Sequence, residues 1–202
     1  MFETVRNAFK IKDLRKKLFY TFFALIVVRI GSQLPVPGVK YEAIREMFNS
    51  QKSLDFFNQL TGGSFESMSI FALNITPYIT ASIIIQLLTI AIPRLEELHK
   101  DGEEGRKKLT EYTRYVTIGL SVMESAAMAI GFGNSGYLTD DKITFTSVSV
   151  IIVSLTAGSA FLMWLGEQIT EKGVGNGISI ILLYNIVSRL PNDVANLYEK
   201  FV

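Results

Sequence analysis

The sequence contains no cysteine and only one histidine, His99. The lack of cysteine excludes disulfide bonds and thiolate metal sites, and one solvated histidine does not make a metal site. The glycine-rich run at 173–177 lacks a preceding strand and a following Lys-Ser/Thr pair, so we interpret it as a tight hairpin and not as a phosphate loop. No nucleophile is visibly paired with a base. The sequence therefore gives no sign of an enzyme and predicts no cofactor.

The chain also lacks an excess of charge of either sign, with 20 Lys and Arg against 19 Asp and Glu. Apolar residues make up 49%, which is close to the soluble average, but they gather in blocks with the charges between them. The clearest block, 70–92, is 23 residues long and uncharged. At about 1.5 Å per residue it can cross the roughly 30 Å hydrocarbon core of a bilayer.

Block 70–92 does not have the composition of a plain lipid anchor. It contains polar residues and a proline that are costly in lipid, namely Asn74, Thr76, Pro77, Thr80, Ser82 and Gln86. Such residues are tolerated where protein or a water-filled path covers them. We therefore expect this helix to be a working part of a membrane protein.

We predict an all-α membrane protein with five transmembrane helices, at 18–34, 70–92, 115–132, 143–166 and 177–190. Three are weaker predictions, because the first contains Arg29, the third contains Glu124, and the fifth is short and ends at Arg189. The basic N-terminal stretch and the first span resemble a signal peptide. Arg29, however, stands where a cleavage motif should begin, and more spans follow, so we interpret this as an uncleaved first span.

The positions of lysine and arginine orient these spans. A cytoplasmic N-terminus places 13 basic residues in the inside segments and six in the outside segments, as the positive-inside rule favours. Residues 1–17 combine apolar residues at helical spacing with basic ones, which predicts an amphipathic helix on the cytoplasmic leaflet or, alternatively, a frayed basic leader. We expect 93–114 to be a cytoplasmic loop, 167–176 a cytoplasmic hairpin and 191–202 an external hinge segment.

Segment 52–69 contains the apolar residues Leu54, Phe56, Phe57 and Leu60, but its run 62–64, Gly-Gly-Ser, interrupts it long before it could span a membrane. We predict a short re-entrant helix that leads into the second span and lies in a cavity of protein or water. An ordinary external loop with an interfacial helix is the alternative. The odd number of spans would place the two ends of the chain on opposite sides, as one half of an inverted repeat requires.

Four runs resemble the N-terminal half of the SecY family of protein-conducting channels. They are RIGSQLPVPG at 29–38, FALNITPYITASIIIQLL at 71–88, DGEEGRKKLTEYTRY at 101–115 and FLMWLGEQITEKGVGNGISII at 161–181. They occur in the family's order and cover nearly the whole chain. The resemblance implies a pore built from two inverted five-span halves, which passes unfolded secretory polypeptides and releases transmembrane segments laterally into the membrane. This chain would supply the first half.

The resemblance implies a hydrophobic ring at the narrowest point of that pore, formed here by Ile75, Ile79 and Leu182. Leu182 departs from the isoleucine that is common in the family but keeps the ring hydrophobic. Independently, positions 75 and 79 share one helix face, although residues alone would favour ordinary packing. A hydrophobic constriction resists ions by dewetting and can close around a passing chain.

Two further sites follow from the resemblance. The re-entrant segment would be a plug over the constriction, centred on Phe57, Asn58, Gln59, Leu60, Thr61, Gly62, Gly63 and Ser64. A polar cluster at a lateral gate would include Thr80 and Glu124. Because an intramembrane carboxylate needs partners, we expect Glu124 to face protein or a wet seam; a buried structural glutamate is the alternative.

The resemblance also implies partners. They are the second half of SecY, SecE, SecG, the SecA motor or a ribosome, signal sequences, nascent polypeptides and the lipid of a bacterial inner membrane. A basic patch of Arg106, Lys107 and Lys108 would face the motor or ribosome, although loop 93–114 as a whole balances six basic against six acidic residues. An inverted-repeat transporter and a membrane scaffold are the competing classes. A transporter would normally place charged groups in the broken helix, which 70–92 lacks.

Overall fold

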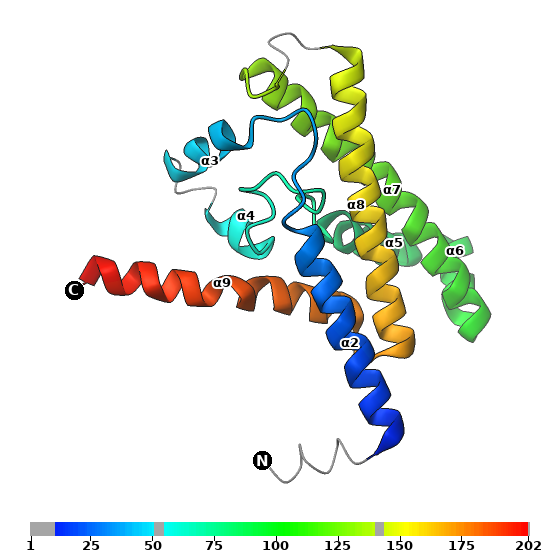
Figure 1. The fold of residues 1–202 in the computed structure, drawn as a ribbon. Helices are drawn as coiled ribbons and strands as arrows, with labels where there is room; N and C mark the ends of the chain where they lie inside the picture. The colour runs from blue at the N-terminus through cyan, green and yellow to red at the C-terminus, as the bar shows by residue number, and fades with distance from the viewer. Residues whose placement is uncertain (1–10, 51–54, 140–143, 202) are drawn as a thin grey trace. The chain divides into compact units, whose positions relative to one another are not determined.

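The computed structural model describes residues 11–50, 55–139 and 144–201. Its helices are α2 (Lys12–Gly31), α3 (Tyr41–Ser50), α4 (Asp55–Leu60), α5 (Thr76–Ala91), α6 (Pro93–Lys100), α7 (Gly102–Asn134), α8 (Phe145–Lys172) and α9 (Gly177–Phe201), shown in Figure 1. Within these ranges the only extended pairings are two isolated bridges, Pro35 with Ser69 and Val39 with Leu138. The predicted all-α class is therefore confirmed. Residues 1–10 of the predicted amphipathic segment and 52–54 of the predicted re-entrant segment lie outside the described residues.

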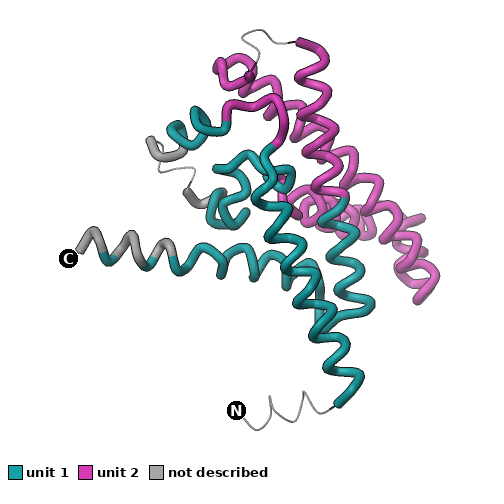
Figure 2. Tube along the Cα trace, in the orientation of Figure 1, with its two compact units in different colours: residues 1–35, 41–72, 161–202 teal, residues 36–40, 73–160 magenta. Residues whose placement is uncertain are grey.

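The chain divides into two compact units (Figure 2). Unit 1 consists of residues 1–35, 41–72 and 161–202, and unit 2 of residues 36–40 and 73–160. Unit 1 therefore holds α2, α3, α4, α9 and the end of α8. Unit 2 holds α5, α6, α7 and the start of α8.

Helices α7 and α8 are long and apolar enough to cross a membrane. Helices α5 and α6 form a third candidate if they are counted as one span, although they meet at a bend of 103°. The apolar part of α9, Gly177–Pro191, is shorter than a spanning helix usually is. By length and composition the described residues thus contain two or three spans, fewer than the five that the sequence predicts.

The second predicted span, 70–92, differs from the structure in extent. Residues 70–75 form turns, and α5 begins only at Thr76 and ends at Ala91. Pro77 lies in its first turn, where a missing N–H costs nothing. Ile92 is extended (φ −113°, ψ 112°), as a residue before proline prefers to be, and Pro93 then starts α6. The helix therefore has 16 residues, or about 24 Å at 1.5 Å per residue.

The segment predicted as a cytoplasmic loop, 93–114, is largely helical, and its cytoplasmic position stays a prediction. It contains α6, a turn at Asp101 and the first turns of α7, and its many Glu, Leu, Lys and Arg residues are good helix formers. Gly105 lets the two helices meet closely, since a Cβ there would lie 1.7 Å from the Leu98 carbonyl oxygen.

Two other predicted connections are also more helical than expected. The hairpin predicted at 167–176 is reduced to residues 173–176 between α8 and α9. The segment predicted as an external hinge, 191–202, continues α9 through Pro191 to Phe201. Gly177 allows the tight α8–α9 connection, because a Cβ there would lie 2.0 Å from the Gly166 carbonyl oxygen.

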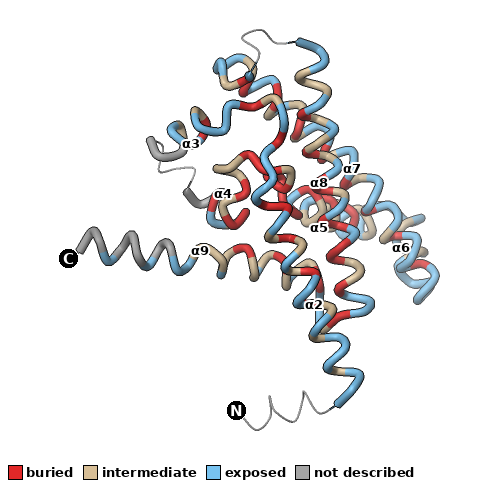
Figure 3. Tube along the Cα trace, in the orientation of Figure 1, coloured by how far each residue is buried: buried red, intermediate tan, exposed pale blue. Residues whose placement is uncertain are grey.

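The core of unit 2 includes a stripe of buried residues on one face of α7; buried residues are red in Figure 3. The stripe repeats nearly every four residues and consists of Gly105, Leu109, Thr113, Thr117, Ser121, Ser125, Ala129 and Phe132. Helix α5 packs against α7. The Ser121 and Ser159 hydroxyls lie 3.2 Å apart, as do those of Ser125 and Thr156, so hydroxyl hydrogen bonds join α7 to α8.

Many large apolar side chains lie exposed on the surface of the described part of the chain. Phe22 and Phe23 on α2, Ile90 on α5 and Phe145 on α8 are all more than 60% exposed. Such surfaces are costly in water and fit a chain whose outer face meets lipid or other protein.

Candidate functional site

The segment after α4 makes a tight reversal in unit 1. Helix α4 ends at Leu60, and Gly62 (φ 65°) and Gly63 (φ 86°) adopt the left-handed conformation that commonly ends a helix. The Gly63 N–H donates to the Asn58 carbonyl at 2.9 Å, and the Ser69 N–H donates to the Ser64 carbonyl at 2.9 Å. We call residues 58–69, which include the last three residues of α4, the reversal segment.

Gly62 brings the reversal segment against α9. A Cβ at Gly62 would lie 3.0 Å from the Asn185 carbonyl oxygen and 3.1 Å from the Ser188 Oγ. Any side chain there would have to displace the α9 backbone as well as adopt an unfavourable positive φ. Glycine is therefore required at this position for the observed approach.

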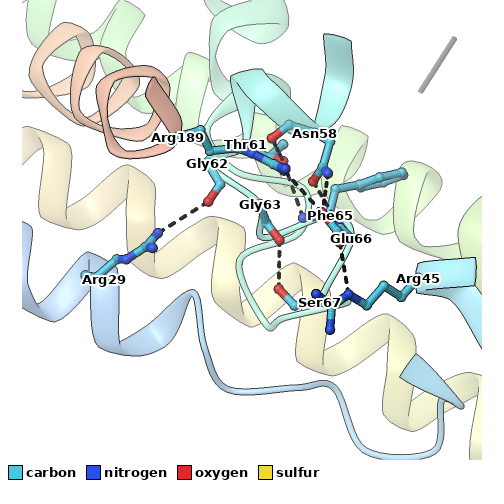
Figure 4. Close-up of polar contacts among 10 residues, drawn as sticks. All are labelled: Arg29, Arg45, Asn58, Thr61, Gly62, Gly63, Phe65, Glu66, Ser67 and Arg189. Carbon is cyan, nitrogen blue, oxygen red and sulfur yellow. Dashed lines mark hydrogen bonds and ion pairs between the residues drawn. The ribbon is translucent and has the colours of Figure 1, made fainter. Parts of the chain in front are cut away.

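A reciprocal pair of hydrogen bonds closes the reversal segment on itself (Figure 4). The Asn58 Nδ2 donates to the Glu66 Oε2 at 2.6 Å, and the Glu66 backbone N–H donates to the Asn58 Oδ1 at 3.2 Å. The Thr61 hydroxyl oxygen similarly accepts the Phe65 N–H at 3.3 Å. Side chains thus satisfy backbone donors that a helix would satisfy internally.

Three arginines from three helices hold the reversal segment from outside (Figure 4). Arg29 of α2 donates from Nη1 to the Gly62 carbonyl at 3.3 Å. Arg189 of α9 places Nη1 3.3 Å from the Glu66 Oε2, and Arg45 of α3 places Nε 3.2 Å from the Glu66 Oε1. The Glu66 and Arg189 side chains are 20% and 22% exposed, whereas Arg45 is 68% exposed. The pair with Arg189 is therefore the better shielded of the two, and an exposed pair adds only about 0–1 kcal/mol.

The end of the reversal segment pairs with the chain that leaves α2. Ser69 forms an antiparallel bridge with Pro35, and the Ile70 N–H donates to the Leu34 carbonyl at 2.9 Å. Met68, just before, has a φ of 41°, which is rare outside glycine and costs about 1–3 kcal/mol. The buried Ser69 Oγ has no hydrogen-bond partner among the described residues. Backbone strain and an unsatisfied hydroxyl therefore coincide at this junction.

The predicted plug residues all fall in α4 and the reversal segment. Phe57 belongs to α4, and its side chain lies outside the described ones. Of the others, Asn58, Thr61, Gly62 and Ser64 are buried, Leu60 and Gly63 are half-buried, and Gln59 is exposed. The geometry shows a segment seated on α9; whether it covers a pore stays a prediction.

The predicted pore-ring residues belong to different units. Ile75, which is 1% exposed, immediately precedes α5, and its carbonyl accepts the Ile79 N–H at 3.1 Å, so Ile75 and Ile79 are one helical turn apart. Ile79 is half-buried. Leu182 is half-buried on α9, in unit 1. The structure thus brings Ile75 and Ile79 together, and the ring itself stays a prediction.

The predicted gate residues lie on neighbouring helices of unit 2. Thr80 is exposed on α5 and Glu124 is half-buried on α7, and these two helices pack together. Neither side chain forms a hydrogen bond or ion pair with another described residue. A direct Thr80–Glu124 bond is therefore not present, and a polar gate remains a prediction.

The predicted cytoplasmic patch lies on the first turns of α7. Arg106, Lys107 and Lys108 are all exposed there. Nearby on α6, Lys100 lies 2.6 Å from Glu96, and this hydrogen bond lowers the pKa of the Glu96 carboxyl. The patch is therefore solvated, and its role as a partner-binding face stays a prediction.

Sequence reasoning missed the contacts of Glu66, Arg45 and Arg189. It interpreted Arg29 and Arg189 only as charges within or beside a span. Glu66 and Arg189 are 123 positions apart, and nothing in a single sequence pairs charges over that separation. The available signal was weak: Glu66 is an acidic residue that follows shortly after the run Gly62-Gly63-Ser64.

Comparisons with known proteins identify relatives that are similar to nearly the whole chain. The SecY family model matches residues 69–202. The protein translocase subunit SecY of Bacillus subtilis (strain 168) is 46% identical over 202 residues, covering 98% of this chain and 46% of the relative. That of Pseudomonas aeruginosa is 44% identical over 192 residues, covering 94% of this chain and 43% of the relative. The chain spans about half the length of the curated relatives that it matches.

Solved structures show the same fold. Sec61 in the canine ribosome-channel complex from the endoplasmic reticulum matches with a TM-score of 0.60 and 21% identity, covering 87% of this chain and 36% of that one. A structure titled as that of a protein conducting channel matches with the same values. At this identity the match concerns the fold alone.

Proposed function

The chain belongs to the SecY family, and on that premise we propose that it forms the first half of a protein-conducting channel. The second half would come from the rest of the same polypeptide or from a separate chain. The channel would pass unfolded secretory polypeptides and release transmembrane segments into the membrane. It would do so as a passive path, with energy supplied by its partners and not by an enzymatic site of this chain.

The observation that carries the proposal is the reversal segment. It is a polar, glycine-turned element seated on α9 beside helices whose outer faces are apolar. Irregular backbone of this kind is tolerated at membrane depth only where protein or water surrounds it. A water-accessible path along this chain would supply that environment.

We assign roles in this path to the residues that the family pattern identifies. Residues 57–64 would be the plug, and Ile75, Ile79 and Leu182 would contribute aliphatic side chains to the constriction. A constriction lined this way excludes ions by dewetting. Thr80 and Glu124 would line the lateral gate, where the lack of a polar partner among the described residues leaves them available to groups of the second half or to water.

We further propose the finer membrane arrangement. Five spans centred on α2, α5, α7, α8 and α9 would cross the bilayer, with the N-terminus in the cytoplasm of a bacterial cell and the membrane its inner membrane. Helices α6 and the start of α7, with Arg106, Lys107 and Lys108, would then face the cytoplasm. The partners would be SecE, SecG, and the SecA motor or a translating ribosome.

A chimera tests this function. Residues 1–202 would replace the matching part of the Bacillus subtilis SecY relative, to which they are 46% identical, in cells whose own channel is depleted. We expect the chimera to restore processing and export of a secreted precursor, which pulse-labelling measures. The remainder of the relative without residues 1–202 is the control and should export nothing. A chimera that accumulates in the membrane while precursors stay unprocessed would contradict the proposal.

A further inference from the structure

We propose that Glu66 is a positioning residue whose ion pair with Arg189 holds residues 57–64 against α9. We call this position of residues 57–64 the seat, and the ion pair that maintains it the lock. The inference rests on the proposed function and extends it to how the plug is held and released. Glu66 lies outside the family-derived plug centre, just beyond Ser64. It acts through other residues and touches no substrate.

Both carboxylate oxygens of Glu66 are in use. Oε2 accepts from Asn58 at 2.6 Å and lies 3.3 Å from the Arg189 Nη1. Oε1 lies 3.2 Å from the Arg45 Nε. One carboxylate therefore joins the start of the reversal segment, through Asn58, to α9 and α3.

The strength of these contacts follows from their shielding. Asn58 is 3% exposed, so its amide depends on the carboxylate for a hydrogen bond that water cannot easily replace. Glu66 and Arg189 are both about four-fifths shielded, and removing one partner would leave the other charge poorly solvated. Arg45 is mostly exposed, so water can replace its contact. Arg189, and not Arg45, should therefore control the seat.

The same contacts make the seat reversible. Besides the close approach of Gly62 to α9, the polar contacts to helices α2, α3 and α9 include those of three flexible arginine side chains, Arg29, Arg45 and Arg189. The α8–α9 connection, in contrast, is closed by the backbone approach of Gly177 to Gly166. Breaking the Glu66–Arg189 pair should therefore release the segment without separating these helices.

Thiol labelling measures the seat directly, because the chain has no native cysteine. Ser64 is 3% exposed, so a single cysteine from Ser64→Cys should react slowly with a membrane-impermeant maleimide in the complete channel. We expect Glu66→Gln and Arg189→Gln each to raise the labelling rate about tenfold, since each removes one partner of a shielded pair. Their combination should add little to either alone. Gln59→Cys, at an exposed position, should label rapidly in every background.

Two further variants separate a lock from a merely structural role. Arg45→Gln removes the exposed partner of the same carboxylate and should change the rate less than about threefold. The exchange Glu66→Arg with Arg189→Glu should return labelling towards the wild-type rate, and this rescue would not occur if either variant acted by misfolding. Wild-type labelling in both Glu66→Gln and Arg189→Gln, or equal effects of Arg45→Gln and Arg189→Gln, would overturn the lock.

Thiol labelling and export by the chimera together test the lock separately from the proposed channel function. Export by the chimera together with unchanged labelling in Glu66→Gln would reject the lock and leave the channel function standing. Increased labelling in Glu66→Gln without export by the chimera would support the lock and contradict the channel function.

Discussion

The reversal segment of unit 1 and the buried face of α7 in unit 2 are both rich in serine and threonine, yet they are held in different ways. On α7, Thr113, Thr117 and Ser121 each donate to the carbonyl four residues earlier, at 2.7–2.9 Å, within an unbroken helix. In the reversal segment, side chains accept backbone N–H groups and arginines from other helices supply further contacts. A helix satisfies its own backbone, as a membrane demands. The reversal segment has backbone hydrogen bonds of its own but also relies on arginine side chains from other helices, which suits the proposed plug.

The largest effect should come from the helical framework. Gly177→Ala would place a Cβ 2.0 Å from the Gly166 carbonyl oxygen and 2.7 Å from the Ile169 Cβ. Because backbone must move, we expect a loss of about 3 kcal/mol or more in stability, seen as a lower thermal unfolding midpoint in detergent. Gly119→Ala is the matched control, since nothing lies within 4 Å of its Cβ. It should be neutral or stabilising by up to about 1 kcal/mol. Equal behaviour of the two variants would contradict the tight α8–α9 connection.

An intermediate and local effect should come from the reversal segment. Gly62→Ala combines a φ of 65° with a 3.0 Å approach to the Asn185 carbonyl, and should destabilise the seat by about 1–3 kcal/mol. We expect faster labelling of Ser64→Cys with an unchanged thermal midpoint for the helices. If the midpoint fell as far as in Gly177→Ala, the segment would be part of the framework and the contrast between the two regions would fail.

The smallest effect should come from the hydroxyls between α7 and α8. Ser121→Ala removes a 3.2 Å hydrogen bond to Ser159 but leaves the α7 backbone intact. Such bonds between membrane helices contribute about 0.6 kcal/mol on average, so the midpoint should fall slightly and Ser64→Cys labelling should not change. A loss as large as that of Gly62→Ala would show that the helices too depend on single side chains.

The sequence predicted which regions are apolar better than it predicted where helices begin and end. Hydropathy identified the apolar parts of α7 and α8 because membrane crossing needs long apolar runs. It placed the start of the second span at residue 70, although Asn74 has a φ of 54° and α5 begins two residues later. It did not predict that the charged segment 93–114 is helical, because charge reports solvation and not backbone conformation.

The candidate site was only partly predictable. Gly62 and Gly63 signalled a chain reversal, and the family resemblance predicted that the segment is a plug. The contacts that hold it could not be predicted, since they join Glu66 to Arg45 and Arg189 from elements distant in sequence. Helix α3 was likewise not predicted. Such pairings are set by tertiary packing.

The central claim is that residues 57–64 form a removable seal in a protein-conducting channel. The most direct measurement is the ionic current through the complete channel in a planar bilayer at rest, with and without these residues. The account predicts a nearly closed wild-type channel and longer open events after deletion, while the helical content stays unchanged. Identical currents from both proteins, with the deletion variant correctly folded, would contradict it.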